Sequence, residues 1–233
     1  MTSPRTEFLS GVRDELPLLV GVIPFGMIYG ILAVSAGIPA VQAQAMSLIL
    51  FAGSSQFITA QLFGHGTPAM VMVLTAAIVN LRHALYSASI APYTRKLRPA
   101  WKWTLAYLLT DEAYAVSIHH YQSHDSHSNP ESTGNKHWYL LGAGLGLWST
   151  WQVSTAMGVF IGAQVPASWS LDYSLVLTFI ALLVPNLRDR PSLAAALAAG
   201  VTAVLAHPLP FKLGLVCAAL VGIITGMWLE SRK

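Results

Sequence analysis

The feature that most constrains this chain is a long segment without charge. From Leu16 to Leu81 the sequence contains no Asp, Glu, Lys or Arg, whereas a soluble domain places one of these residues at about every fourth position. Residues 137–171, 191–211 and 213–229 are charge-free as well. Each of these segments is long enough, or nearly so, to cross the roughly 30 Å hydrocarbon layer as a helix. The sequence therefore predicts an all-α integral membrane protein embedded in a lipid bilayer.

The number of spans follows from where the apolar segments begin and end. Barrel strands are excluded because the segments are continuously apolar and do not alternate. We expect seven or eight transmembrane helices in a single polytopic domain, residues 1–233, without a removable signal peptide. The expected helices cover residues 16–37, 40–63, 68–91, 101–119, 138–163, 172–187, 191–207 and 210–229.

A weak internal repeat is visible in the sequence. Asn80-Leu81-Arg82 reappears as Asn186-Leu187-Arg188, and SSQFITA at 54–60 resembles TWQVSTA at 150–156. Chance similarity is the alternative explanation. If the repeat is real, its halves cover about 16–119 and 138–207, and the offset of three spans inverts one half relative to the other. A 3+3 inverted repeat followed by one or two C-terminal helices is the architecture of many secondary transporters.

Two hydrophilic segments separate the apolar ones. Residues 92–102 carry four basic residues and no acidic one, which places this loop on the cytoplasmic side. Residues 120–137 are rich in histidine, and we interpret them as a hydrophilic, solvated loop. A zinc or pH-sensing site is the alternative there, but we predict no bound metal and no cofactor.

Charged and polar residues lie within two of the expected spans. The third span contains Asn80, Arg82 and His83, and the fourth contains Asp111 and Glu112. A charge at the centre of a membrane helix costs about 2.5 to 3.5 kcal/mol on insertion scales, so such residues normally face a partner, a protein interior or water. At 1.5 Å rise per residue Arg82 and Asp111 have similar depth, which predicts an ion pair from Arg82 to Asp111 or Glu112.

This pair has two interpretations. It either ties two helices together, or it lies on a transport pathway in which an acid holds the substrate ammonium or a coupling proton. In the second case Arg82 or an unwound helix N-terminus would hold a carboxylate. Neutral amides at mid-span extend the candidate pathway or else join helices. The candidate residues for the substrate or proton pathway are Gln56, Asn80, Arg82, His83, Asp111, Glu112, Gln152 and Asn186.

Glycines recur with the spacing that allows membrane helices to approach closely. The pairs are Gly26 and Gly30, Gly142 and Gly146, Gly158 and Gly162, and Gly222 and Gly226. We interpret them as packing residues.

The composition argues against other classes of function. The net charge of +3 is too small and too dispersed to indicate nucleic acid. A serine and a histidine could form an intramembrane hydrolase site, but nothing in the sequence selects such a pair, and no zinc-protease motif is present. We therefore predict a small-solute transporter and not an enzyme. An ion or small-solute channel is the alternative, and an intramembrane hydrolase a distant third.

Several motifs resemble one known family. GVIPFGMIYGILAVSAGI, SLILFAGSSQF, AAIVNLRHALYSASIAPY and LLTDEAYAV are similar to segments of the AzlC family of branched-chain amino acid permeases, which is linked to azaleucine resistance. The similarity is most specific between residues 21 and 116. It implies a multi-pass protein of the bacterial inner (cytoplasmic) membrane that exports valine, leucine, isoleucine or analogues together with a small AzlD-like membrane protein.

Overall fold

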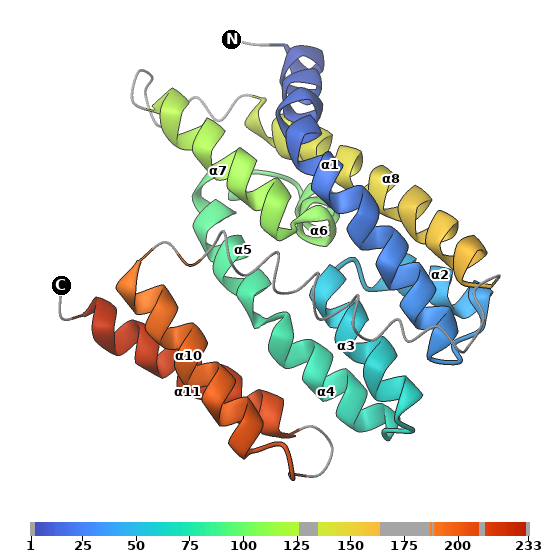
Figure 1. The fold of residues 1–233 in the computed structure, drawn as a ribbon. Coiled ribbons are helices and arrows are strands. Elements are labelled where there is room, and N and C mark those ends of the chain that lie inside the picture. Colours follow the sequence, from blue (N-terminus) through green and yellow to red (C-terminus); the bar gives the residue numbers. More distant parts are fainter. Residues whose placement is uncertain (1–2, 126–134, 164–186, 188, 210–212, 232–233) are drawn as a thin grey trace. The chain divides into compact units, whose positions relative to one another are not determined.

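The computed structural model describes residues 3–125, 135–163, 187, 189–209 and 213–231 (Figure 1). These residues form α-helices joined by turns and contain no β-strand, which confirms the all-α prediction. The helices are α1 (Pro4–Ser35), α2 (Ala40–Ile49), α3 (Gly53–Gly64), α4 (Ala69–Val79), α5 (Leu81–Thr94), α6 (Pro99–Leu108), α7 (Asp111–Asp125), α8 (Lys136–Gly162), α10 (Arg190–Leu205) and α11 (Leu213–Glu230).

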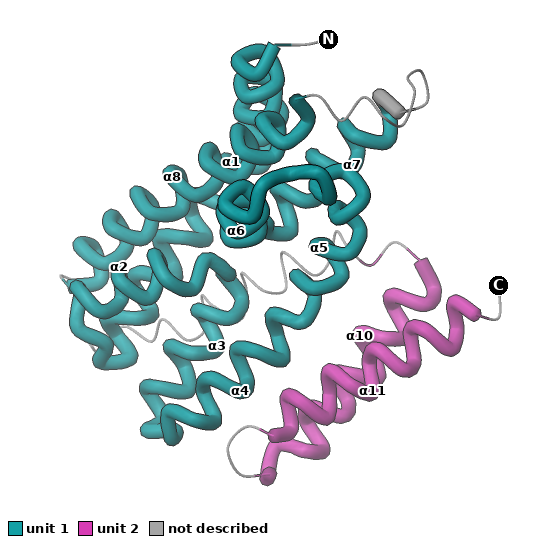
Figure 2. The backbone as a smooth tube through the Cα atoms, turned by 180° about the vertical axis from the view of Figure 1, so that it is seen from behind, with its two compact units in different colours: residues 1–167 teal, residues 168–233 magenta. Residues whose placement is uncertain are grey.

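The chain packs as two compact units, Met1–Ala167 and Ser168–Lys233 (Figure 2). The first unit contains α1 to α8 and the second contains α10 and α11. This division tests neither the single polytopic domain nor the inverted repeat, and both stay predictions. The expected span 172–187 lies almost wholly outside the described residues.

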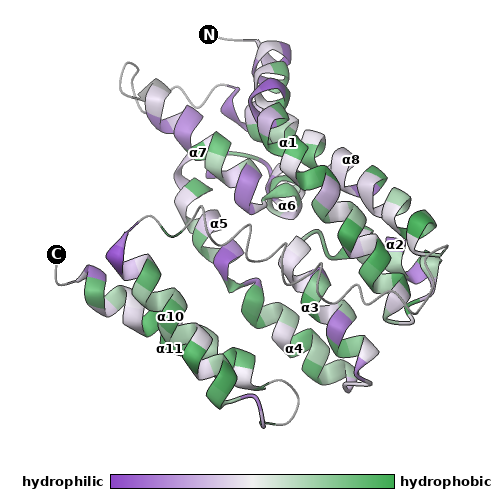
Figure 3. Ribbon diagram, viewed as in Figure 1, coloured by the Kyte–Doolittle hydropathy of each residue, from purple (hydrophilic) through white to green (hydrophobic). Residues whose placement is uncertain are grey.

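Several helices have the length and composition of membrane spans. Three long stretches qualify within the described residues: Pro4–Ser35, the α4–α5 stretch Ala69–Thr94, and Leu213–Glu230. Hydrophobic residues cover much of α4 and α11, whereas hydrophilic residues gather on the first turns of α1 and on α7 (Figure 3). Large apolar side chains such as Val20 and Leu85 are exposed, as suits contact with lipid.

Three of the expected spans are interrupted, at positions that the sequence analysis did not identify. The span 40–63 divides into α2 and α3 around the non-helical Leu50–Ala52. The span 68–91 divides into α4 and α5 at Asn80, and the span 101–119 divides into α6 and α7 at Leu109 and Thr110. Non-helical backbone at membrane depth is tolerated where it is buried in protein or lines a cavity.

A local signal explains the start of α7. The Thr110 hydroxyl accepts a hydrogen bond from the Ala113 amide at 3.4 Å, which is the arrangement of an N-cap. Asp111 and Glu112 then occupy the first turn, where negative charge complements the helix dipole. The sequence TDEA thus begins a helix in the middle of an expected span.

The long helices α1 and α8 pack closely along glycines. A Cβ atom on Gly158 would lie 2.1 Å from the Met27 carbonyl oxygen, and one on Gly142 would lie 2.1 Å from that of Phe8. On α1, a Cβ on Gly30 would lie 2.5 Å from the Thr155 oxygen. The predicted packing role is confirmed for these glycines, because only a missing side chain permits this approach.

The histidine-rich segment contains more helix than predicted. α7 runs to Asp125 and α8 begins at Lys136, so both ends of the expected loop 120–137 are helical. Tyr121 and Tyr139 are buried in the contact between these helices. Burial of their apolar rings stabilises the helical ends of this segment, whereas a solvated loop has no such contact.

Candidate functional site

An ion pair joins α5 and α7. Arg82 Nη1 lies 2.6 Å from Asp111 Oδ2, which confirms the ion pair predicted from the sequence. The two helices also pack through Tyr86 and Tyr114, whose stacked rings have centroids 4.5 Å apart. Because Tyr86 follows Arg82 by one helical turn and Tyr114 follows Asp111 similarly, this aromatic contact sets the register that brings the charges together.

Two hydrogen bonds connect the ion pair to α3. Arg82 Nη2 donates to Ser54 Oγ at 2.6 Å, and Ser55 Oγ donates to Asn80 Oδ1 at 2.6 Å. Ser54, Arg82 and Asp111 each lie in the first turn of their own helix. The N-termini of three helices therefore meet at one cluster, the Arg82 site, which comprises Ser54, Ser55, Asn80, Arg82 and Asp111.

The electrostatics of the Arg82 site combine both signs. Helix N-termini carry partial positive charge and unsatisfied amide donors, and Arg82 adds a full positive charge. Asp111 supplies negative charge, and Glu112 interacts electrostatically with both Asp111 and Arg82. Groups of this kind can hold the carboxylate and the ammonium of one zwitterion.

The ion pair retains unused hydrogen-bonding capacity. Side-chain exposure is 33% for Arg82 and 38% for Asp111, so solutes can reach both. Within the part of the chain that the structure describes, neither Arg82 Nε nor Asp111 Oδ1 has a hydrogen-bond partner. Both of these atoms are buried, whereas other parts of the two side chains are exposed.

The other predicted residues lie in different surroundings. The His83 ring makes an edge contact with Tyr86, with centroids 5.9 Å apart. Gln56 is fully buried and donates to the Met46 carbonyl of α2 at 3.4 Å. Asn186 lies outside the described residues.

Gln152 belongs to a second polar cluster, between α2 and α8. It accepts a hydrogen bond from Gln44 at 2.9 Å and donates to the Ser47 carbonyl at 3.1 Å. Ser47 and Thr155 form a further hydrogen bond at 3.1 Å. These contacts agree with the alternative interpretation, in which the Gln152 amide joins two helices and does not line a pathway.

Sequence reasoning missed two buried acidic residues, Glu7 and Glu15. The first expected span begins at residue 16, but α1 begins at Pro4, and Glu15 is 0% exposed. The available signal was Ser3-Pro4, a serine N-cap followed by proline, which marks a helix start well upstream of residue 16. No three His, Cys, Asp or Glu side chains come together as metal ligands within the described ranges.

Comparison with known proteins decides the family. The model of the AzlC protein family matches residues 17–165, a range that contains the whole Arg82 site. This chain belongs to the AzlC family. The resemblance inferred from its motifs is thereby confirmed.

Two relatives that match nearly the whole chain are membrane proteins by name. An uncharacterized membrane protein of Archaeoglobus fulgidus is 32% identical over 97% of this chain and 97% of its own length. The inner membrane protein YgaZ of Escherichia coli is 26% identical over 95% of this chain and 91% of its own length.

One relative has a name that states a transported substrate. The branched-chain amino acid transport protein AzlC of Bacillus subtilis is 27% identical over 76% of this chain and 66% of its own length. No solved structure matches the chain significantly. Membership of the AzlC family, together with this relative, supports membrane transport as the general function.

Proposed function

We propose that this chain transports branched-chain amino acids across the bacterial inner membrane, in the direction of export. The observation that carries the proposal is the Arg82–Asp111 ion pair, held at the N-termini of three helices and still exposed to solutes. In this proposal Arg82 and the adjacent helix N-termini bind the substrate carboxylate. Asp111, with Glu112 beside it, binds the ammonium group.

The apolar side chain of the substrate requires a hydrophobic contact. Tyr86 lies one turn beyond Arg82 and packs on Tyr114, so its ring offers an apolar surface next to the charged groups. A branched aliphatic side chain gains roughly 25 cal/mol for each Å² that it buries. Valine, leucine and isoleucine fit this combination of paired charges and apolar surface.

A small AzlD-like membrane protein is the proposed partner. The name of the B. subtilis relative and the family membership support transport. The two-component arrangement is what the resemblance to the family implies. Exposed apolar side chains such as Val201, Val204 and Leu205 on α10 offer a surface that either lipid or such a partner can cover.

Counterflow of labelled valine in proteoliposomes tests the proposed function. We expect saturable uptake of labelled valine into vesicles preloaded with unlabelled valine, with competition by leucine and isoleucine. The measurement is made with and without the co-reconstituted partner. Flux that rises linearly with concentration and shows no counterflow would instead indicate a channel.

A further inference from the structure

A second acidic site lies in α1, apart from the Arg82 site. Glu15 is 0% exposed, and neither of its carboxylate oxygens has a hydrogen-bond partner in the described part of the chain. A charged carboxylate without a partner in such surroundings costs several kcal/mol, so the group takes up a proton instead. An ionisable residue on a membrane helix is a candidate for a functional group.

No basic side chain forms a hydrogen bond with Glu15 within the described residues. α8 contributes Tyr139, whose charge state is coupled to Glu15, and α7 contributes Glu112, which repels it. α2 and α3, which also pack on α1, contain no titratable residue. On α1 itself Asp14 is the neighbouring acid and the Arg13 side chain is exposed.

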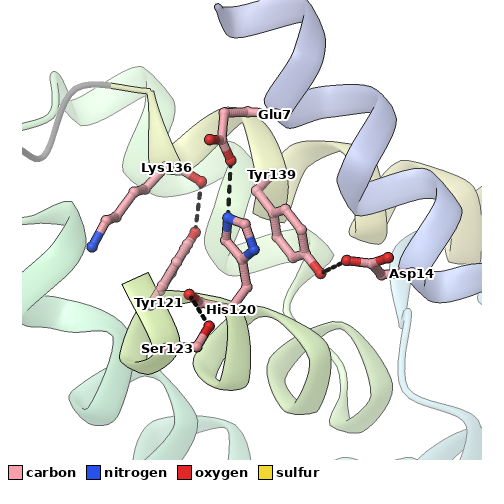
Figure 4. A network of polar contacts seen from close by, with 7 residues as sticks. All are labelled: Glu7, Asp14, His120, Tyr121, Ser123, Lys136 and Tyr139. Carbon is pink, nitrogen blue, oxygen red and sulfur yellow. Dashed lines mark hydrogen bonds and ion pairs between the residues drawn. The ribbon is translucent and has the colours of Figure 1, made fainter. Parts of the chain in front are cut away.

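A group of polar contacts begins at Asp14, the residue next to Glu15, and extends to the first turn of α1. The Tyr139 hydroxyl donates to Asp14 Oδ2 at 2.7 Å, and the Tyr139 ring stacks on His120 with centroids 3.8 Å apart. His120 Nε2 lies 3.0 Å from Glu7 Oε2. Figure 4 shows these groups side by side between α1, α7 and α8. Each of them can donate or accept a proton.

Acidic groups also lead from Glu15 toward the Arg82 site. Glu112 repels Glu15, and it is the residue next to Asp111 in the first turn of α7. Asp111 is in turn paired with Arg82. The repulsion between Glu112 and Glu15 therefore connects Glu15 electrostatically with the site to which the proposed function assigns the substrate.

We propose that Glu15 is a proton-binding site, buried and neutral for most of its time, that exchanges its proton with water. Uptake forms an O–H bond on the Glu15 carboxylate, and release returns the proton to water. Release leaves a negative charge next to Glu112, and this repulsion links the proton to the Arg82 site. The coupling to transport rests on the proposed function, whereas the proton binding does not.

The chemistry of the site favours a proton over a metal cation. A metal ion requires several oxygen ligands that converge on one point. The described residues contain no cluster of three acidic or histidine side chains, and the nearest acid, Asp14, is already bonded to Tyr139. A single buried carboxylate without further ligands suits a proton.

Labelling with dicyclohexylcarbodiimide tests the site without a transport assay. This reagent attacks protonated carboxyl groups in apolar surroundings, and peptide mass spectrometry locates the adduct. With the purified full chain we expect an adduct on Glu15 at neutral pH that declines as the pH rises. The exposed Glu230 is the internal control and should stay unmodified. Absence of the Glu15 adduct would overturn the proposal, as would protection by sodium ions at constant pH.

Two substitutions then separate proton binding from transport. Glu15→Gln mimics the neutral carboxyl group, and we expect it to retain valine counterflow but to lose accumulation driven by a pH gradient. Glu15→Asp keeps a carboxyl group and should retain both the adduct at residue 15 and gradient-driven accumulation. If Glu15→Gln accumulates valine like the wild type, Glu15 is not the coupling site. If the wild type shows no valine counterflow but is labelled at Glu15, only the proposed function fails.

Discussion

The guanidinium of Arg82 and the carboxylate of Asp111 form an ion pair of 2.6 Å between the first turns of α5 and α7. A positive residue in the first turn of a helix opposes the helix dipole. The pairing with Asp111 and the hydrogen bond to Ser54 offset this cost. A cation retained at a place where the helix disfavours it indicates a role beyond the stability of that helix.

The first prediction concerns the ion pair itself. Asp111→Asn removes the proposed ammonium partner and should lower the initial rate of valine counterflow by about tenfold to hundredfold, because a hydrogen bond to a charged group contributes about 1.5 to 3 kcal/mol. Asp189→Asn is the matched control. Asp189 caps α10 by accepting from Ser192, and asparagine caps a helix equally well. Unchanged transport with an unchanged pH dependence in Asp111→Asn would contradict the assigned role.

The second prediction concerns the hydrogen bond between Ser55 and Asn80. Ser55→Ala and Asn80→Ala should each lower the free energy of unfolding by about 1 kcal/mol, the usual net contribution of one hydrogen bond. The double variant should lose less than the sum, because both changes remove the same interaction. Thermal unfolding in detergent measures all three. Strict additivity would show that the bond contributes nothing to stability.

The third prediction concerns the contact between α1 and α8. Gly158→Ala places a methyl group 2.1 Å from the Met27 carbonyl oxygen, so the helices must separate. We expect a loss of about 1 to 3 kcal/mol, as for other overpacked sites. Gly21→Ala is the same substitution on α1 with no atom within 4 Å, and it should leave the unfolding temperature unchanged or slightly raised. Equal effects of the two substitutions would contradict the close packing.

The fourth prediction concerns acid stability and His137, just before the expected span 138–163. Its ring packs edge-on against Trp101, with centroids 4.7 Å apart, and burial lowers the pKa of His137. The unfolded chain therefore takes up this proton at a higher pH than the folded chain. Stability should fall as the pH drops below the ordinary histidine pKa of about 6.5.

A glutamine at this position tests the sign of the effect. His137→Gln should lose less thermal stability than the wild type between about pH 7.5 and about pH 5.5, on either side of the ordinary pKa. His119→Gln, at an exposed histidine of α7, should keep the wild-type dependence on pH. A His137→Gln variant as sensitive to acid as the wild type would show that another group is responsible.

The sequence by itself determined membrane residence, helical class and an ion pair from Arg82 to either Asp111 or Glu112. The long uncharged segment leaves no alternative to lipid, and two opposite charges at equal depth in neighbouring spans must find each other because either one alone is costly there. These conclusions depend on the energy of individual residues in a bilayer, which can be read from residue identity and position.

Only the tertiary structure decided where the expected spans break and which polar groups meet. Gln152 bonds to Gln44 on α2, although its mid-span position suited the pathway equally well. Glu15 is buried because α1 extends upstream and packs on α7 and α8, a result of which helix faces come together. Depth in the membrane follows from the sequence, but the direction in which a side chain points depends on packing between helices that are distant in the chain.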